Sequence, residues 1–147
     1  MCAIWRGAKS VAIELQGLEE VLNKIGKLGD TAKINSALGK ACALVERAAK
    51  EKAPKGDTGE LRRSITSEVK DYQGIIYTPL EYAPYVEYGT GLFAENGGRQ
   101  NVPWKYQDDK GEWHKTSGQK PQPYMRPALN ENREEIKRIL EGALKND

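Results

Sequence analysis

The chain has 147 residues, of which 38% are hydrophobic and 30% charged, a composition typical of one globular domain with solvated helices. Its formal net charge of +2 argues against a dedicated nucleic-acid-binding protein, which carries a strong basic field. Cys2 and Cys42 have no CxxC spacing, which indicates a reducing compartment and argues against a disulfide framework or a zinc site.

The N-terminal region predicts one strand and one helix. We expect a single domain over residues 1–147, with residues 1–10 flexible. Apolar and polar residues alternate over residues 11–15, which is the period of a half-buried strand. Over residues 18–28 the apolar residues follow helical spacing, and Gly29 stands where a helix ends. No stretch resembles a signal peptide or the roughly 20 apolar residues of a membrane span, so we expect synthesis in a cytoplasm and no membrane contact.

A long amphipathic helix is predicted over residues 32–52, and it is the expected centre of the core. Asp30 or Thr31 can cap its start, and Pro54 ends it because proline disfavours helix in the residue before it. Apolar residues at helical spacing form one stripe on this helix: Ile34, Leu38, Ala41, Val45 and Ala48.

The next segment predicts a β-hairpin followed by a short helix. Residues 64–69 alternate, a turn is expected at 71–74, and residues 75–77 form the partner strand. Residues 80–88 are then expected to form a short helix. Two sets of residues are each expected on one side of their element: Ile65, Ser67 and Val69 on the strand, and Tyr82, Tyr85 and Val86 on the helix.

Residues 92–120 are rich in glycine and polar residues, and we expect a long mobile loop or assembly arm there. Alternation around Trp104 predicts that this loop carries its own small hairpin. A turn at residues 108–111 would place Tyr106 opposite Trp113 across the antiparallel pair.

The C-terminal region predicts one helix with Pro127 at its first position, where a proline is well tolerated. Glu134 and Arg138 are expected to form a supportive pair on it. Its apolar face is expected to consist of Leu129, Ile136, Ile139, Leu140 and Ala143. The elements together predict an α+β fold: a small antiparallel sheet packed against two or three helices, with a long loop carrying a hairpin and a C-terminal helix.

The triplet Asp57-Thr58-Gly59 is also the catalytic motif of aspartic proteases. That chemistry needs two carboxylates that share one proton in a low-dielectric cleft, so a short chain would have to dimerise. Here the triplet follows a polar turn and precedes a helical pattern. Asp57 is therefore interpreted as a helix N-cap, with Glu60 completing a capping-box-like pair. We expect no enzyme activity, and a dimeric aspartic-type protease is the less favoured alternative.

Neither a metal nor a cofactor is expected. His114 is the only histidine, and no second histidine or thiol lies near it in the sequence. The segment Gly89-Thr90-Gly91 lacks the further glycine and the lysine of a phosphate-binding loop, so it is interpreted as a turn that ends a helix.

Basic residues and aromatic residues provide the candidate contact surfaces. The basic residues near Pro54 are interleaved with acidic ones, so a solvated face or a subunit contact is favoured over a DNA-facing patch. A small nucleic-acid-binding module remains an alternative function. Surplus aromatic residues commonly anchor protein–protein interfaces. The candidate interface consists of Phe93, Trp104, Tyr106, Trp113, Arg62 and Arg63.

Three motifs occur in order along the chain. The first spans residues 57–65 and reads TG-x-LR-x-S-I from its second residue, the second spans residues 85–90 and reads YVE-x-GT, and the third spans residues 123–128 and reads P-[FY]-x-RPA. Over residues 11–144, this ordered set resembles the neck and tail-component family of long-tailed bacteriophages, the Hong Kong 97-type tail proteins.

The resemblance implies a structural function in head–tail joining or tail completion. It implies a subunit of a homo-oligomeric ring, or one docked on a ring, that contacts other phage neck or tail proteins in a virion assembled in the host cytoplasm. It also implies that the second and third motifs hold the two ends of the variable loop against the core. The residues that carry this structural signature are Asp57, Thr58, Gly59, Tyr85, Glu87, Gly89, Arg126 and Pro127.

Overall fold

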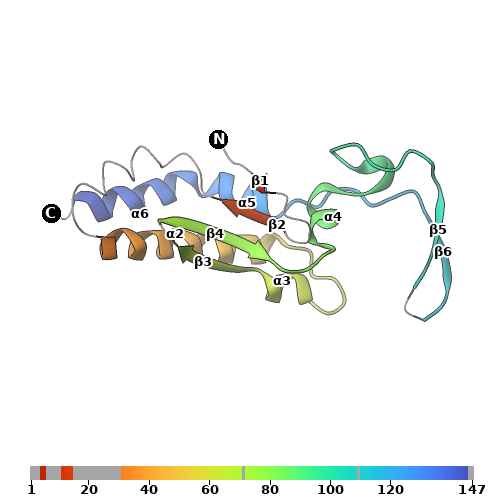
Figure 1. Cartoon of the computed structure of the whole chain (residues 1–147), viewed down its shortest axis with the longest axis horizontal. Helices are drawn as coiled ribbons and strands as arrows, with labels where there is room; N and C mark the ends of the chain where they lie inside the picture. Colours follow the sequence, from red (N-terminus) through yellow and green to blue (C-terminus); the bar gives the residue numbers. More distant parts are fainter. Residues whose placement is uncertain (1–3, 6–10, 15–30, 71, 109, 146–147) are drawn as a thin grey trace.

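The computed structural model describes residues 4–5, 11–14, 31–70, 72–108 and 110–145. The elements in chain order are β1 (Ile4–Trp5), β2 (Val11–Glu14), α2 (Thr31–Lys52), α3 (Glu60–Ser64), β3 (Thr66–Lys70), β4 (Gln73–Thr78), α4 (Ala83–Tyr88), the 3-10 turn η1 (Gly91–Phe93), β5 (Trp104–Gln107), β6 (Trp113–Thr116), α5 (Met125–Glu131) and α6 (Arg133–Lys145). This arrangement confirms the predicted α+β fold with a small antiparallel sheet and a C-terminal helical region (Figure 1).

The main sheet has the strand order β1-β2-β4-β3, and every neighbouring pair is antiparallel. Ile76 of β4 lies at its centre, opposite Ile13 on one side and Ser67 on the other. The hairpin between β3 and β4 is tight, since Lys70 pairs directly with Gln73. The predicted strands in residues 64–69 and 75–77 are therefore confirmed, with slightly different ends, and the strand in residues 11–15 is confirmed over its described residues, 11–14.

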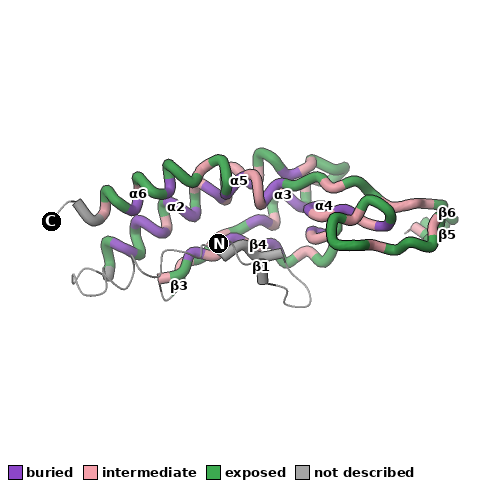
Figure 2. The backbone as a smooth tube through the Cα atoms, turned by 90° about the horizontal axis from the view of Figure 1, so that it is seen from above, coloured by how far each residue is buried: buried purple, intermediate pink, exposed green. Residues whose placement is uncertain are grey.

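Helix α2 is the centre of the core, as its apolar stripe predicts. It packs against β3 and β4 and also against α5 and α6. Figure 2 shows buried positions recurring along α2 where it faces these elements. Ala41, Val45 and Ala49 have no exposed surface, and Leu38 is 1% exposed. Burial of this stripe stabilises α2, since most helical stability in proteins comes from tertiary packing of the apolar face.

The C-terminal region contains two helices where one was predicted. Helix α5 begins at Met125, so Pro127 occupies its third position rather than its first. Asn132 separates α5 from α6, and its side-chain amide donates a hydrogen bond of 2.7 Å to the Ala128 carbonyl. A side chain that bonds to the preceding turn competes with the regular helical pattern, which explains the interruption.

Two further expectations need correction. Arg138 pairs with Glu135 at 3.2 Å, not with Glu134. In α4 the inward positions are Ala83, Val86 and Glu87, whereas Tyr85 is 59% exposed. Tyr82, Tyr85 and Val86 therefore do not share one side, because Glu87 takes the inward position one turn beyond Ala83.

Two expectations concern segments that the structure describes only in part or not at all. The helix predicted over residues 18–28 lies outside the described residues. Of residues 1–10, which were expected to be flexible, the structure describes Ile4–Trp5, and these form β1 beside β2. Among the described helices, none combines the length and hydrophobicity needed to cross a membrane.

Candidate functional site

Residues 92–120, here called the arm, leave the body after α4 and return to it before α5. Figure 1 shows the β5–β6 ribbon of this arm standing away from the body, at the opposite end of the molecule from α6. The arm does carry the predicted hairpin, but its register differs by one residue. Tyr106 lies opposite His114, and Trp113 lies opposite Gln107.

The Asp108 carboxylate explains the shift in register. Its Oδ1 accepts hydrogen bonds from the backbone N–H groups of Lys110 at 2.9 Å and Glu112 at 2.8 Å. The Asp108 N–H also donates to the Glu112 carbonyl at 3.0 Å. Glu112 is therefore part of the turn, whereas the sequence interpretation ended the turn at Gly111.

This turn also gathers three potential metal ligands that the sequence interpretation did not bring together. His114 Nε2 lies 2.8 Å from Asp108 Oδ2, and ligand atoms of Asp108, Glu112 and His114 all lie within 4.8 Å of one another. The hydrogen bond with His114 lowers the pKa of the Asp108 carboxyl. The bonds from His114 and the backbone account for the position of Asp108 without any ion.

The two ends of the arm are tied to each other at its base. The Thr90 N–H donates to the Gln119 carbonyl at 2.9 Å, and the Gln119 N–H donates back to Thr90 Oγ1 at 2.9 Å. Gly91 has a φ of 60°, and a Cβ there would lie 2.3 Å from the Ser117 carbonyl oxygen. Glycine is thus required at this position both for the backbone conformation and for the close approach of the returning chain.

The buried carboxylate of Glu87 joins α4 to the start of α5. It is fully buried, and it accepts backbone N–H bonds from Tyr124 at 2.8 Å, Met125 at 3.0 Å and Arg126 at 3.2 Å. Arg126 Nε donates a further bond of 2.9 Å to the same carboxylate. The first N–H groups of a helix lack partners within the helix, and a negative charge at that end is favourable. Glu87 therefore caps α5 from 37 positions away in the sequence.

Arg126 extends this network into the arm. Its Nη1 and Nη2 donate to the two carboxylate oxygens of Glu95 at 2.8 and 3.1 Å, which is a bidentate pair. Its guanidinium carbon also lies 4.8 Å from the ring centroid of Tyr88. The hydrogen bonds from Arg126 lower the pKa of Glu95, and those with Glu95 and Glu87 raise the pKa of Arg126. We call Glu87, Glu95 and Arg126 the clamp, because they connect the core, the arm and α5.

The first motif forms a helix start, but Asp57 is not its cap. The N-cap of α3 is Gly59, with a φ of 65°. The Glu60 N–H donates to the Thr58 hydroxyl at 3.3 Å, while Asp57 lies exposed in the preceding turn. The Glu60 carboxylate accepts a bond from the Tyr82 hydroxyl at 3.3 Å, so the predicted capping box is also absent. The left-handed conformation of Gly59 moves Asp57 out of reach of the helix.

Three basic residues near Pro54 have partners within the chain, whereas Lys55 and Arg63 are exposed. Arg62 Nε donates to the Ala53 carbonyl at 2.7 Å and so supports the C-terminal end of α2. Lys50 pairs with Glu46 on α2, and Lys52 pairs with Glu131. Arg62 and Arg63 both lie on α3, which belongs to the body (Figure 1). Neither residue therefore joins the aromatic residues of the arm.

Comparison with known protein families gives one match. The model of the family described as "Bacteriophage HK97-gp10, putative tail-component" matches residues 16–89. The chain belongs to this family. It is thus a bacteriophage tail component, and membership makes it a virion-associated protein. No curated protein and no solved structure matches the chain significantly.

The family match begins after β2, at residue 16, and ends at Gly89, directly after α4. It includes the first motif and Glu87, whereas Arg126 and the arm lie beyond it. Glu87 contributes to both parts, since it lies near the end of the matched region and caps α5. The sequence motifs identify Glu87 and Arg126 individually in this tail component. Only the structure shows that the two residues bind each other.

The aromatic residues of the arm differ in how much they are covered. Trp104 is half-buried, and the guanidinium of Arg99 lies 5.3 Å from its ring centroid. Lys120 lies 5.9 Å from the ring centroid of Phe93, which is 41% exposed. Among the large hydrophobic residues of the described structure, Trp113 has the largest exposed fraction, 67%.

Tyr124, which precedes α5, provides a test of the packing beside the clamp. Its side chain is fully buried, and its hydroxyl has no hydrogen-bond partner among the described residues. Burial raises the pKa of this hydroxyl. A buried hydroxyl without a partner costs about 1–3 kcal/mol, so Tyr124→Phe should leave stability unchanged or increase it. Urea denaturation measures this effect, and a loss of more than about 1 kcal/mol would show that the hydroxyl has a partner.

Proposed function

We propose that this tail component acts in the neck of the phage, in head–tail joining or tail completion, as a subunit of a ring or docked on one. The observation that supports this proposal is the arm. It stands away from the body, it is tied at its base, and it exposes apolar surface that the body does not cover. Such surface commonly marks a contact with another protein.

The clamp supports an assembly function because it restricts where the arm can point. The Arg126–Glu95 pair and the backbone bonds of Thr90 fix the base of the arm on the core. A contact segment held in one orientation loses less conformational entropy on association than a free loop. The partners we propose are further copies of this chain and other neck or tail proteins, which meet during assembly in the bacterial cytoplasm.

We propose a structural and not a catalytic role. Asp57 of the DTG triplet is exposed in a turn, which is unlike the enclosed carboxylate pair that aspartic-protease chemistry needs. Lys50 and Lys52 pair with carboxylates of the chain, which reduces the basic surface offered to DNA at the α2–α3 junction. Nucleic-acid binding therefore remains the less favoured alternative.

Replacement of the outer arm tests the proposed function. Residues 99–116 can be exchanged for a short Gly/Ser linker, because Gly98 and Ser117 both lie against Gly91. This variant keeps Glu95 and the bonds at the base of the arm. We expect an unchanged helical circular-dichroism spectrum, a melting temperature within a few degrees of the parent, and loss of oligomers and of tail or virion assembly.

The readouts are circular dichroism, sedimentation velocity and electron microscopy of particles complemented with the variant. The control is the parent protein, whose arm keeps its length and its sequence. Normal assembly by the shortened protein would contradict the proposal. Unfolding of the shortened protein would instead show that the outer arm belongs to the core.

A further inference from the structure

Strand β3 forms an open edge of the main sheet. The strand order β1-β2-β4-β3 places it last, with β4 as its one neighbouring strand among the described residues. Lys70 pairs directly with Gln73 across a two-residue turn, and the pair that closes such a turn is hydrogen-bonded. Bonded and non-bonded pairs alternate along an antiparallel ladder. The backbone groups of Ser67 and Val69 therefore point away from β4, toward the free edge.

Strand β6 of the arm has a free edge of the same kind. The Asp108 N–H donates to the Glu112 carbonyl at 3.0 Å, so this pair is hydrogen-bonded and the next pair toward the base of the arm is not. By the same alternation, the backbone groups of Trp113 and Lys115 point away from β5. Both strands thus offer free N–H and C=O groups on alternate residues.

The β5–β6 ribbon also lacks the support that a third strand gives. It has two strands, and no other strand of the described chain pairs with it. An isolated two-stranded ribbon is marginally stable in water, whereas three strands with an apolar face can be stable. Trp113, on the free strand, leaves 67% of its surface exposed. A strand that paired with β6 would supply this support.

One antiparallel register joins the free edges of β3 and β6 along the whole of β3. It sets Val69 opposite Trp113, so the outward backbone groups of the two strands meet. The facing pairs in this register are Thr66 with Thr116, Ser67 with Lys115, Glu68 with His114, Val69 with Trp113, and Lys70 with Glu112.

The side chains that face each other in this register are complementary. Two threonines, a β-branched residue beside an aromatic one, and opposite charges are each favourable across a strand pair. Lys70 and Glu112 are both exposed, and neither has an ion pair within the described residues. Val69 already packs against the core, so Trp113 beside it would extend that apolar surface.

The neighbouring registers lack this complementarity. A shift of two residues in one direction sets Lys70 opposite His114, and a shift in the other direction sets Glu68 opposite Glu112. Like charges directly opposite destabilise the pairing. A shift of one residue turns every side chain to the other face. Charges on an edge strand resist pairing with arbitrary strands, so β3 selects a strand whose charges match its own.

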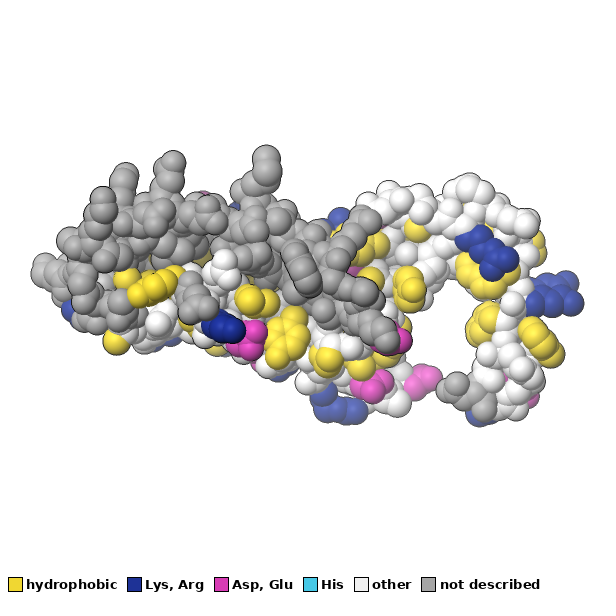
Figure 3. All heavy atoms as spheres, in the orientation of Figure 1, with side chains coloured by type: hydrophobic (Ala, Val, Ile, Leu, Met, Phe, Trp, Pro, Cys, Tyr) yellow, Lys and Arg dark blue, Asp and Glu magenta, His cyan; other side chains and the backbone are white. Residues whose placement is uncertain are grey.

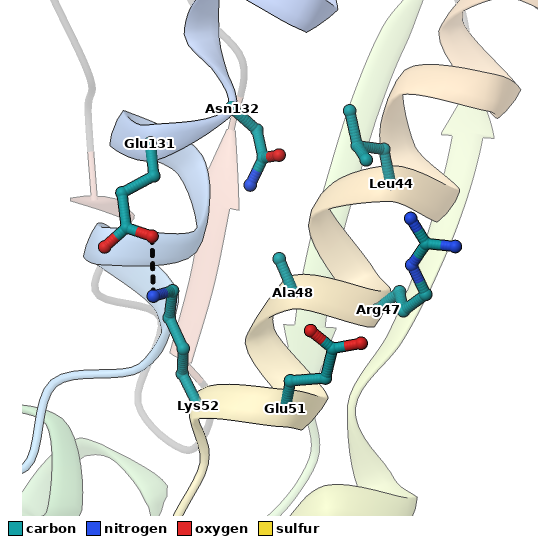
Figure 4. Close-up of a pocket in the computed structure, with 7 residues that line it drawn as sticks. All are labelled: Leu44, Arg47, Ala48, Glu51, Lys52, Glu131 and Asn132. Carbon is teal, nitrogen blue, oxygen red and sulfur yellow. Dashed lines mark ion pairs between the residues drawn. The ribbon is translucent and has the colours of Figure 1, made fainter.

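The groove between α2 and the α5–α6 junction is a less suitable receptor for the arm (Figure 4). Arg47 and Lys52 balance Glu51 and Glu131 in its lining, which is mainly polar. Lys52 also bridges the groove to Glu131 at 2.6 Å. The groove therefore offers neither a net charge nor an apolar surface that would select the arm.

We propose that β6 of one copy adds to the β3 edge of the next copy in the register given above. Strands that add to a sheet edge gain affinity from main-chain hydrogen bonds and specificity from alternate side chains. This inference rests on the proposed ring, for which it names the contact.

The placement of the two strands favours a contact between copies. Figures 1 and 2 both show β3 on the body, far from the β5–β6 ribbon, and Figure 3 shows the arm projecting as a separate limb. One chain therefore cannot pair its own β6 with its own β3 in this conformation. A contact between two different surfaces is heterologous, and its repetition closes a ring when the rotation permits.

Two proline variants test which edge of the ribbon makes the contact. Lys115→Pro removes an outward N–H donor from β6, and Lys105→Pro removes one from the directly opposite position of β5. Both residues are exposed in the arm, so the body should stay folded, which circular dichroism checks. We expect sedimentation velocity to show oligomers for the parent and for Lys105→Pro, and monomers for Lys115→Pro. Lys115→Ala keeps the N–H and should still assemble.

A charge exchange tests the register. Lys70→Glu sets two carboxylates opposite each other in the contact, and Glu112→Lys sets two ammonium groups opposite each other. Each variant should weaken association about tenfold, as measured from the concentration dependence of sedimentation. The chain that carries both substitutions restores the pair and should associate like the parent.

The outcomes separate failure of this contact from failure of the ring. A parent protein that is monomeric at all concentrations would contradict both. An oligomeric parent whose Lys115→Pro variant assembles normally would keep the ring and place its interface elsewhere. If both proline variants were monomeric, the charge exchange decides: recovery in the double variant supports the contact, and no recovery overturns it.

Discussion

Glu87→Ala is expected to destabilise the domain by about 3–5 kcal/mol, because removing one partner of a buried charged network leaves the other groups without compensation. The substitution would orphan the backbone N–H groups of Tyr124 and Met125 and remove one of the two carboxylates that bind Arg126. Urea denaturation monitored by circular dichroism measures the change in the free energy of unfolding.

Two further variants make this experiment specific. Glu87→Gln keeps the shape and one acceptor oxygen, so it should cost less than the alanine variant. Glu134→Ala removes an exposed carboxylate from α6 and should change stability by no more than about 0.5 kcal/mol. If Glu87→Ala were as stable as the parent, the clamp would not hold α5 to the core.

Leu38→Asp is expected to unfold the domain at room temperature. Leu38 is 1% exposed in the centre of α2, so the substitution buries an unpaired carboxylate and leaves a cavity. The cost of several kcal/mol approaches the roughly 5–15 kcal/mol of total stability that is typical of a domain. Loss of the cooperative thermal transition in circular dichroism would show the effect.

The matched control is Lys40→Asp, at an exposed position of the same helix. It introduces the same aspartate, which is a poor helix former, at a position where the carboxylate stays in solvent. The loss of stability should therefore be about 1 kcal/mol. Equal stability of the two variants would mean that α2 does not present Leu38 to the core.

The local pattern of the sequence predicted much of the body. The apolar stripe of α2 and the alternation in β3 are both set by neighbours a few residues apart. Both were confirmed, except that Ala49 and not Ala48 is fully buried at the end of the stripe. The buried positions of the C-terminal region were also confirmed at Leu129, Ile136 and Leu140. Periodicity succeeds in these cases because each element buries one face against the same core.

The errors arose where a side chain bonds outside the regular pattern. The Asp108 carboxylate enlarged the turn of the arm and shifted its register, and Asn132 divided the C-terminal helix. At α3 the conformation of Gly59 replaced the expected Asp57 cap. These are choices between local hydrogen bonds of similar strength, and the surrounding structure decides among them.

By itself, the sequence determined the class of the fold, the core of α2 and the family, because these depend on periodicity and on short motifs. Only the tertiary structure decided that Glu87 caps α5 and that Arg126 ties the arm to the core. The residues involved lie 31 to 39 positions apart. Nothing in the spacing of two distant residues indicates that they meet. They are paired because folding buries the Glu87 carboxylate at the free N–H groups of a helix start, where a polar group without a partner is costly.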